Sequence, residues 1–344
     1  MGLLPPSGTR QRDAANLDRG IDPGRGGGYP PGMRRPPPLR AGDVVRVIAP
    51  GSGFEPAHFE AGLRVLRDRL GLEPRFRDDI TAREGYLAGD DRRRLAEWTE
   101  AVDDPEARAI FCARGGYGAM RLLPGLDPAP LLLRPKLLVG FSDVTALHAR
   151  LNTAGLATLH GPVVTQLGRA PADAVAHLEA LLLGAVPSRL DGPGRGLTGT
   201  ATIRPGRASG PLLGGSLTLL AHLCGTPWQP SLRGAILFFE DVGERPYKLD
   251  RYLTQLRLSG ALDGVAGVAV GQLTGCDGED GGGEGAATVR RLVAALGVPA
   301  IEGLPAGHED RNLALPLGPR ATLTAPAPGE AGPPRLQFDE GATA

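Results

Sequence analysis

The sequence predicts an α/β fold in two parts: an N-terminal domain built on a parallel sheet of the Rossmann or flavodoxin-like type, and a C-terminal mixed α/β domain rich in short strands. Three observations support this prediction. A chain of 344 residues has room for roughly two domains of about 150 residues each. In the first half, short apolar runs alternate with helix-like patterns, which is typical of parallel βαβ units. In the second half the same patterns follow in a more mixed order, with several short strand-like runs.

The N-terminal domain is expected over residues 41–182, and its elements follow from hydrophobic periodicity. Apolar residues form unbroken runs where strands are expected, and they recur every three or four positions where helices are expected. Gly71 ends the first helix, and Asp90 or Asp91 caps the second. The strands are expected at 44–49, 109–113 and 137–140, and the helices at 59–70, 90–102 and 144–151. The loops that follow such strands form the ligand face of a parallel sheet.

Residues 183–200 are rich in glycine and proline, so they are expected to link the first domain to a second over residues 201–344. In the second domain the helices are expected at 216–223, 247–258 and 288–296, and the strands at 235–239 and 265–271, with further short strands toward Phe338. The acidic, glycine-rich segment 275–285 is interpreted as a solvated loop, because it lacks the ligand spacing of an EF-hand calcium site.

Residues 1–40 differ from the rest of the chain. They are rich in Pro, Gly and Arg and show almost no apolar periodicity, so they cannot bury enough surface to offset the entropy cost of ordering. A disordered extension is therefore expected. The segment has no apolar run of signal-peptide length, and Pro6 occupies the position where N-myristoylation needs Ser or Thr.

The composition argues against several classes of function. Lys+Arg number 38 and Asp+Glu also number 38, so the formal net charge is zero and nothing indicates a nucleic-acid partner. No apolar run approaches the roughly 20 residues that a membrane span needs. Cys112, Cys224 and Cys276 lie far apart and show no CxxC spacing. We therefore expect a cytoplasmic protein with reduced thiols and no membrane partner.

The segment Leu137–Thr145 is the most informative local pattern. An apolar strand ends at Gly140, and Ser142 comes directly before a helix, which is the arrangement of a nucleophile elbow. In that geometry the helix N-terminus and the next backbone N–H face a developing oxyanion. The full G-x-S-x-G motif is not met, because position 144 is Val144. The alternative is that Ser142 or Asp143 only caps the helix.

A serine nucleophile needs a general base, and two of the six histidines are placed for that role. His58, His148, His177 and His222 fall in predicted helices and are interpreted as surface or interior residues. His160 and His308 lie in predicted loops. His308 and Glu309 could begin a zinc motif, but Asn312 occupies the position of the second histidine, so no metal site is predicted.

An acidic residue is also needed to orient the base, and Glu240 is the better of two candidates. Glu240 and Asp241 follow a strongly apolar strand, where side chains can point into a cleft. The alternative is that Glu240 is a carboxylate at the rim that pairs with Arg245 or Arg251. The segment 114–118 is a second glycine loop at a strand end, whose backbone N–H groups could bind an anion. It lacks the lysine and the spacing of a phosphate loop, so no nucleotide cofactor is predicted.

Taken together, these segments resemble the LD-carboxypeptidases, the muramoyl-tetrapeptide carboxypeptidases whose relatives include the microcin C immunity peptidases. The resemblance runs from about Gly42 to about Leu323, and six segments occur in the expected order, which is more specific than any one of them. The segments are Val47–Ser52, Ala113–Gly118, Gly140–Asp143, His160–Pro162, Phe239–Asp241 with Pro246, Tyr247, Asp250 and Arg251, and Gly307–His308 with Asn312 and Pro316–Gly318.

The resemblance implies a serine peptidase without a cofactor. It implies that Ser142 is the nucleophile, that His308 is the base and that Glu240 orients His308. The backbone N–H groups of Gly116 and Asp143 would form the oxyanion hole, and the two partners of Ser142 would come from the other domain. Family members often pair as homodimers. Residues 1–40 have no counterpart, and the 275–285 loop is longer than expected. Contacts with substrate are expected from the following residues: Arg114, Tyr117 and His160.

The function expected from the resemblance is the release of D-alanine from murein tetrapeptide during peptidoglycan recycling. Ser142 would attack the carbonyl before the C-terminal D-alanine, and water would then hydrolyse the acyl-enzyme. Two other hypotheses stay open. One is a microcin C-type immunity peptidase that hydrolyses a peptidyl-nucleotide, and the other is a non-catalytic protein of two lobes that binds a ligand between them.

Overall fold

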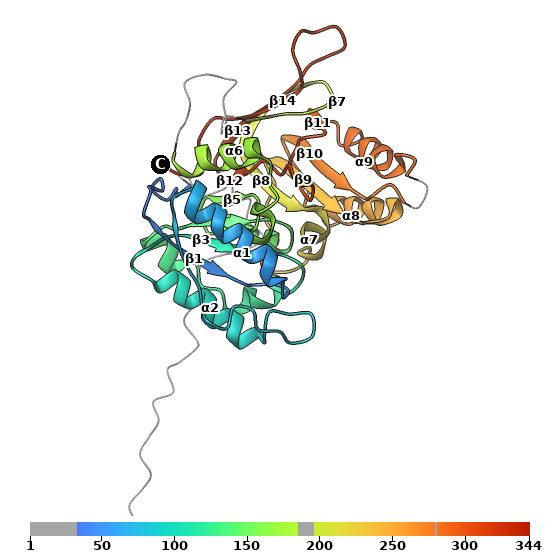
Figure 1. The fold of residues 1–344 in the computed structure, drawn as a ribbon. Helices are drawn as coiled ribbons and strands as arrows, with labels where there is room; N and C mark the ends of the chain where they lie inside the picture. The colour runs from blue at the N-terminus through green and yellow to red at the C-terminus, as the bar shows by residue number, and fades with distance from the viewer. Residues whose placement is uncertain (1–32, 185–195, 279–280) are drawn as a thin grey trace, which may run out of the picture.

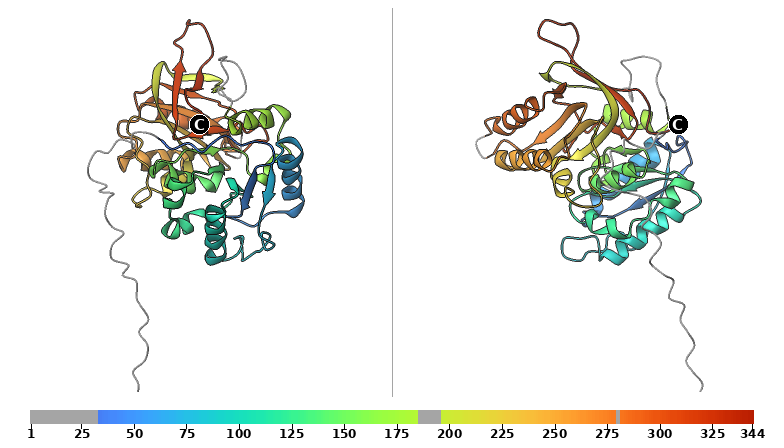
Figure 2. Two further views of the ribbon diagram at one scale, coloured as in Figure 1. Left: turned by 90° about the vertical axis from the view of Figure 1, so that its left-hand side faces the viewer. Right: turned by 180° about the vertical axis from the view of Figure 1, so that it is seen from behind.

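The computed structural model describes residues 33–184, 196–278 and 281–344. Within these residues the strands form one sheet of six strands and one of eight. Figure 1 shows the strands of the N-terminal half in one lobe and β8 to β11 in the other, with α8 and α9 on the outer side of the second lobe. The views in Figure 2 show the same two lobes from the side and from behind. The predicted α/β architecture is confirmed.

The predicted strands and helices all occur, with bounds that differ by a few residues, whereas β8, α5 and α6 are among the elements that hydrophobic periodicity did not predict. The strands are β1 (Val44–Ile48), β2 (Glu73–Arg75), β3 (Ala107–Cys112), β4 (Leu137–Gly140), β5 (Thr158–His160), β6 (Gly196–Thr198), β7 (Ala201–Arg204), β8 (Gly206–Ser216), β9 (Ile236–Val242), β10 (Gly267–Thr274), β11 (Ala300–Glu302), β12 (Leu315–Leu317), β13 (Arg320–Ala325) and β14 (Arg335–Phe338). The α-helices are α1 (Pro56–Arg64), α2 (Asp91–Asp103), α3 (Ala129–Leu133), α4 (Thr145–Thr153), α5 (Val164–Leu167), α6 (Ala172–Leu182), α7 (Leu217–His222), α8 (Pro246–Leu258) and α9 (Glu284–Ala294), and the short helical turns are η1 (Val65–Arg69), η2 (Ala119–Gly125) and η3 (Ser142–Val144).

The six-stranded sheet has the order β12-β5-β4-β3-β1-β2. The strands β1 to β5 are parallel where they pair, so the loops after β1, β3 and β4 meet at one edge. The edge strand β12 pairs antiparallel with β5, although it belongs to the C-terminal part of the chain. The predicted boundary before residue 201 assigns β12 to the second domain, whereas the structure places this strand in the sheet of the first domain. Pro316 lies in the middle of β12, and proline is tolerated there because the strand is at a sheet edge.

Alternation along the central strands buries both faces of this sheet. Val45 and Val47 pack with Phe59 and other residues of α1 on one face. On the opposite face Ile48 packs with Trp98 of α2. A parallel sheet covered on both faces leaves its loops as the exposed surface, which is where the sequence placed the ligand face.

The eight-stranded sheet has the order β6-β14-β13-β8-β9-β10-β11-β7. Phe239 of β9 is buried on the face of the sheet that α8 covers, where it packs with Leu249 and Leu253. Phe238 points the other way and shares a buried cluster with Leu212 of β8 and Val139 of β4. The hydrophobic core is therefore continuous between the lobes. Because side chains alternate along a strand, Glu240 faces the same side as Phe238, toward the N-terminal lobe.

Two predicted segments partly differ from the structure. Residues 33–40, assigned to the disordered extension, contact the N-terminal lobe: the N–H of Leu39 donates to Leu182 O at 2.9 Å, and the Leu39 side chain is buried. The rest of the extension, residues 1–32, lies outside the described residues. Most of the predicted linker, residues 185–195, also lies outside them, whereas Gly196–Thr198 forms β6 and pairs with β14.

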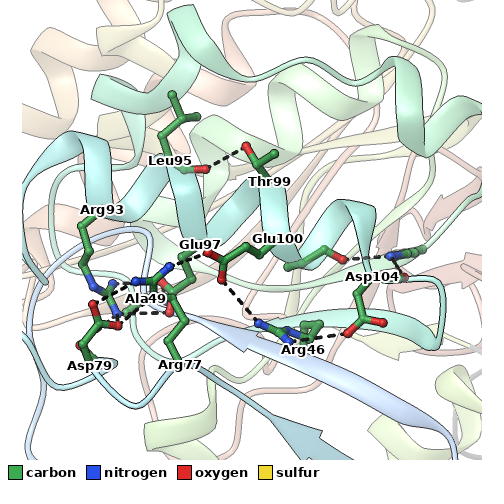
Figure 3. A network of polar contacts seen from close by, with 12 residues as sticks. Arg46, Ala49, Arg77, Asp79, Arg93, Leu95, Glu97, Thr99, Glu100 and Asp104 are labelled. Carbon is green, nitrogen blue, oxygen red and sulfur yellow. Dashed lines mark hydrogen bonds and ion pairs between the residues drawn. The ribbon is translucent and has the colours of Figure 1, made fainter.

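Buried charged groups on α2 hold the loops at the carboxyl edge of the first sheet. The Glu97 carboxylate accepts from the N–H of Ala49 at 2.8 Å and from Arg93 at 3.0 Å, within the network that Figure 3 shows. The Arg94 guanidinium is fully buried. It donates to Pro50 O, in the loop after β1, and to Gly118 O at 2.9 Å, in the loop after β3. Arg94 therefore ties two of the three loops together.

We predict that Arg94→Met destabilises the protein. Each carbonyl oxygen left buried without a donor costs about 1 to 3 kcal/mol of unfolding free energy, while methionine keeps much of the packing. Urea denaturation followed by circular dichroism measures the change. Arg92→Met, on the exposed side of the same helix, is the matched control and should change the unfolding free energy little. Equal midpoints for the two variants would contradict the role of Arg94.

Candidate active site

Ser142 occupies a strained turn between β4 and α4. Among the described residues it is the one non-glycine residue with a positive φ, 65°. A left-handed backbone costs free energy for a residue with a Cβ, and such strain concentrates at functional sites. The turn needs room: a Cβ on Gly115 would lie 3.0 Å from Ser142 Cβ, and a Cβ on Gly140 would lie 3.1 Å from Val144. This is the elbow geometry that the strand and helix pattern indicated.

The structure brings Ser142, His308 and Glu240 together across the two lobes. Ser142 Oγ lies 3.0 Å from Nε2 of His308, and Nδ1 of His308 lies 2.6 Å from Oε2 of Glu240. Glu240 comes from β9, and His308 comes from the segment between β11 and β12. Gly307 permits the short contact, because a Cβ there would lie 3.0 Å from Glu240 Oε2. The order hydroxyl, imidazole, carboxylate is the arrangement of a serine nucleophile with its base and orienting acid.

Burial makes this arrangement electrostatically strong. The Glu240 side chain is 0% exposed and that of His308 is 16% exposed. Burial lowers the pKa of the His308 imidazole, but the charge and hydrogen bond of Glu240, with a further contribution from the charge of Asp241, outweigh it, so this pKa lies above its ordinary 6.5. Glu240 therefore favours the protonated imidazole that forms when His308 takes a proton.

Asp143 and Gly116 are the two residues whose backbone N–H groups are expected to form an oxyanion hole. Gly116 lines the cavity in front of Ser142. The backbone N of Asp143 lies 3.2 Å from the place a Cβ on Gly115 would take, so a side chain there would obstruct it. The Asp143 carboxylate points inward and accepts from the N–H of Ala119 at 2.8 Å. Burial raises the pKa of this carboxyl to about 6, against the opposing effects of Ala119 and Arg94.

A cavity of about 530 Å³ opens in front of Ser142 and is lined by both lobes. Arg114, one of the expected substrate contacts, lines it, and its guanidinium donates to Gly53 O at 2.6 Å. From the C-terminal lobe, Val242 and His308 line this cavity. The cavity can therefore hold an acyl group against the Ser142 hydroxyl with a cation close by.

The other two expected substrate contacts lie elsewhere. His160 is 0% exposed and does not line the cavity; its ring packs at 5.0 Å from the ring of Phe238 and at 5.8 Å from that of Phe141. The structure therefore places His160 in the core behind the Ser142 turn, because it ends a central strand rather than lying in a loop. Tyr117 is 54% exposed, stacks edge-on against Tyr86 and is likewise not part of the cavity lining.

Several cavity residues were not identified from the sequence. They come from the start of α1 and from the segment after β5: Glu55, His58, Val163, Thr165, Gln166 and Arg169. The signal that could have pointed to them is that β5 is the next parallel strand after β4, so the loop that follows it must reach the same edge of the sheet.

Within residues 33–184, 196–278 and 281–344, no cluster of His, Cys, Asp and Glu could hold a metal ion. Within those residues, no helix is both long enough and apolar enough to span a bilayer.

Comparison with known proteins places the two lobes in one family. Residues 45–161 match the LD-carboxypeptidase N-terminal domain, and residues 209–323 match the LD-carboxypeptidase C-terminal domain. The murein tetrapeptide carboxypeptidase of Pseudomonas aeruginosa is 37% identical over 292 residues, which cover 81% of this chain and 92% of that protein. The crystal structure of muramoyltetrapeptide carboxypeptidase from Oxalobacter formigenes superposes with a TM-score of 0.75 at 31% identity, over 86% of this chain and 98% of that chain.

A second group of relatives has the same fold. The microcin C7 self-immunity protein MccF of Escherichia coli is 25% identical over 318 residues, which cover 83% of this chain and 92% of that protein. A structure of MccF in complex with glutamyl sulfamoyl guanosine superposes with a TM-score of 0.78 at 21% identity, over 90% of this chain and 99% of that chain.

We predict that the reactivity of Ser142 depends on pH through His308. The imidazole can accept a proton only when neutral, so the rate at which a fluorophosphonate labels Ser142 should rise with pH through an apparent pKa above 6.5. Glu240→Gln removes the main charge that raises this pKa, so the transition should move to lower pH. Mass spectrometry of the labelled protein against pH measures both values.

Glu302→Gln is a matched control for this measurement, because Glu302 lies on β11 of the same sheet and pairs with Arg290 rather than with His308. Its profile should overlay that of the unmodified protein. A Glu240→Gln profile that also overlays it would show that Glu240 does not set the protonation of His308.

Proposed function

Because the chain belongs to the LD-carboxypeptidase family, we propose that it is a serine carboxypeptidase that releases the C-terminal D-alanine of murein tetrapeptide. The observation that carries this proposal is the distance of 3.0 Å between Ser142 Oγ and Nε2 of His308, with Glu240 at 2.6 Å on the other side of the ring. The named activity of the Pseudomonas aeruginosa relative supports the choice of substrate. The proposed cleaved bond joins the diamino acid to D-alanine.

In the acylation step, Ser142 Oγ attacks the carbonyl carbon before D-alanine while Nε2 of His308 takes the hydroxyl proton. The backbone N–H groups of Gly116 and Asp143 donate to the developing oxyanion. Glu240 holds the ring through Nδ1 and stabilises the imidazolium. When the C–N bond breaks, His308 gives the proton to the amine of D-alanine, which leaves with both electrons of that bond.

In the deacylation step, a water molecule attacks the ester that joins the peptide to Ser142. His308 takes a proton from this water and then returns it to Ser142 Oγ as the ester bond breaks. The products are D-alanine and a tripeptide with a free carboxylate. The Arg114 guanidinium, in the cavity lining, is proposed to attract the carboxylate of the terminal D-alanine.

Two further expectations complete the proposal. From the resemblance to the family, we infer that the protein works as a homodimer, which analytical ultracentrifugation of the purified chain tests. A cytoplasmic location is consistent with the recycling of murein fragments, and cell fractionation with an antibody against the chain tests it.

We predict that Ser142→Ala abolishes D-alanine release. Removing one member of such a catalytic unit costs about a millionfold in rate in other serine peptidases. The assay incubates the purified variant with murein tetrapeptide and quantifies free D-alanine with D-amino acid oxidase. Ser259→Ala, at the end of α8, is the matched control and should release D-alanine at the unmodified rate. Retained activity in Ser142→Ala would overturn the proposed mechanism.

The alternative functions give different outcomes in parallel assays. An immunity peptidase of the MccF kind would cleave a peptidyl-adenylate analogue and leave murein tetrapeptide intact. A binding protein without catalysis would take up neither a fluorophosphonate nor an acyl group on Ser142. We expect D-alanine release together with fluorophosphonate labelling of Ser142 that Ser142→Ala abolishes.

A further inference from the structure

His308 lies on a segment that passes from one lobe to the other. The chain leaves β11 of the eight-stranded sheet at Glu302 and enters β12 of the six-stranded sheet at Leu315. Figure 1 shows β11 in the C-terminal lobe and β12 beside β5 in the N-terminal lobe. We call residues 307–312 of this connection the base loop. Its position depends on contacts with both lobes.

The C-terminal lobe holds the base loop through the side chains of Gln272 and Glu240. Gln272 of β10 accepts from the N–H of Glu309 at 3.0 Å, and its amide donates to Arg311 O at 3.0 Å. The pair between His308 and Glu240 also lies within this lobe. The contact between His308 and Glu240 is therefore direct and uses no side chain of the N-terminal lobe.

The N-terminal lobe holds the base loop through Gln166 of α5. The Gln166 amide donates to Glu309 O at 2.9 Å and accepts from Asn312 Nδ2 at 3.1 Å. Asn312 Oδ1 in turn accepts from the N–H of Gly307 at 3.0 Å, directly before His308. Both amide side chains are almost fully buried, with Gln166 2% and Asn312 1% exposed. These bonds fix the loop on both sides of the imidazole.

Two ion pairs at the surface also join the base loop to the N-terminal lobe, one to the segment after α5 and one to α6. Arg169 Nε lies 2.6 Å from Asp310, and Arg311 Nε lies 2.7 Å from Asp173. All four side chains are about half exposed, and exposed pairs of this kind contribute little. The buried amide bonds of Gln166 therefore supply more of the attachment between the N-terminal lobe and the base loop than the exposed ion pairs do.

We propose that Gln166 is a positioning residue that sets the distance between Ser142 and His308. Ser142 belongs to the N-terminal lobe and His308 follows the C-terminal sheet, so their contact depends on how the base loop is attached to the N-terminal lobe. Gln166 makes this attachment at two points after His308, Glu309 and Asn312, and Asn312 in turn bonds to the N–H of Gly307 directly before His308. An error of about 1 Å in such a geometry can cost on the order of 100-fold in rate. The inference rests on the proposed function, because it assigns Gln166 to the same reaction.

Gln166→Met tests the proposal, because methionine has a similar length and lacks the amide. We expect kcat for D-alanine release to fall about 10-fold to 100-fold, KM to stay within about twofold, and the apparent pKa of the pH profile to stay unchanged, because Glu240 and His308 keep their contact. Gln255→Met, on the exposed face of α8, is the matched control and should keep the unmodified kcat.

Asn312→Asp keeps the acceptor for Gly307 and removes the donor to Gln166, so it tests the same bond if Gln166→Met does not fold. A folded variant with unchanged kcat would overturn the proposal. So would a raised KM with unchanged kcat, which would make Gln166 a substrate contact through its place in the cavity lining.

Fluorophosphonate labelling separates this proposal from the proposed function. If the unmodified protein labels at Ser142 but releases no D-alanine, the proposed substrate fails. In that case a 10-fold or greater loss of labelling rate in Gln166→Met still supports the positioning role, and an unchanged labelling rate rejects it.

Discussion

Ser142 follows a strand of one sheet and His308 follows a strand of the other, so the hydrogen bond between their side chains requires the two sheets to keep a fixed relative position. That requirement explains why the interior is continuous between the lobes. Phe238 faces the N-terminal lobe and packs in one cluster with Val139, which lies just before the Ser142 turn. Rigid packing of this kind is needed because a loose seam would let the 3.0 Å contact open. The site is thus a property of the whole domain arrangement rather than of one loop.

Each part of the site is held by a different physical device. Ser142 is presented by a strained backbone that only small neighbours, Gly115 and Gly140, allow. His308 is oriented by a carboxylate that is completely buried, so the attraction is weakly screened by water. The loop that carries Gly116, a proposed oxyanion donor, is held by Arg94, a buried cation that contacts the carbonyl oxygens of Pro50 and Gly118. The free-energy cost of the strained backbone and the buried charges is offset by the apolar side chains buried in the cores of the two sheets.

Much of the fold could be predicted from the sequence, because hydrophobic periodicity reports local structure directly. The strand Leu137–Gly140 and the cap Asp90 are confirmed as expected. The side chains Ser142, Glu240 and His308 were named from motifs, and the structure brings them together. These three residues could be combined because the order of the six motifs resembles one family. Local periodicity alone does not relate residues that are separated by the length of a domain.

What could not be predicted depends on pairing over long sequence distances. The strand Leu315–Leu317 is too short to show a hydrophobic periodicity, and it is recognisable as a strand only from its pairing with β5. His160 is expected at a strand end in contact with substrate, whereas at the end of β5 its ring packs in the core beside Phe238. The bond between Gln166 and Asn312 joins two ordinary polar residues that no local pattern relates.

The exchange of β12 has a consequence for how the chain can be divided. A fragment that stops in the glycine- and proline-rich connection near residue 190 would lack the strand that covers the edge of β5. Such a fragment would expose unpaired backbone groups along a short, apolar strand, which favours self-association. Splitting the gene at this connection would therefore leave the N-terminal half prone to self-association, although the family's two sequence modules fall on either side of it.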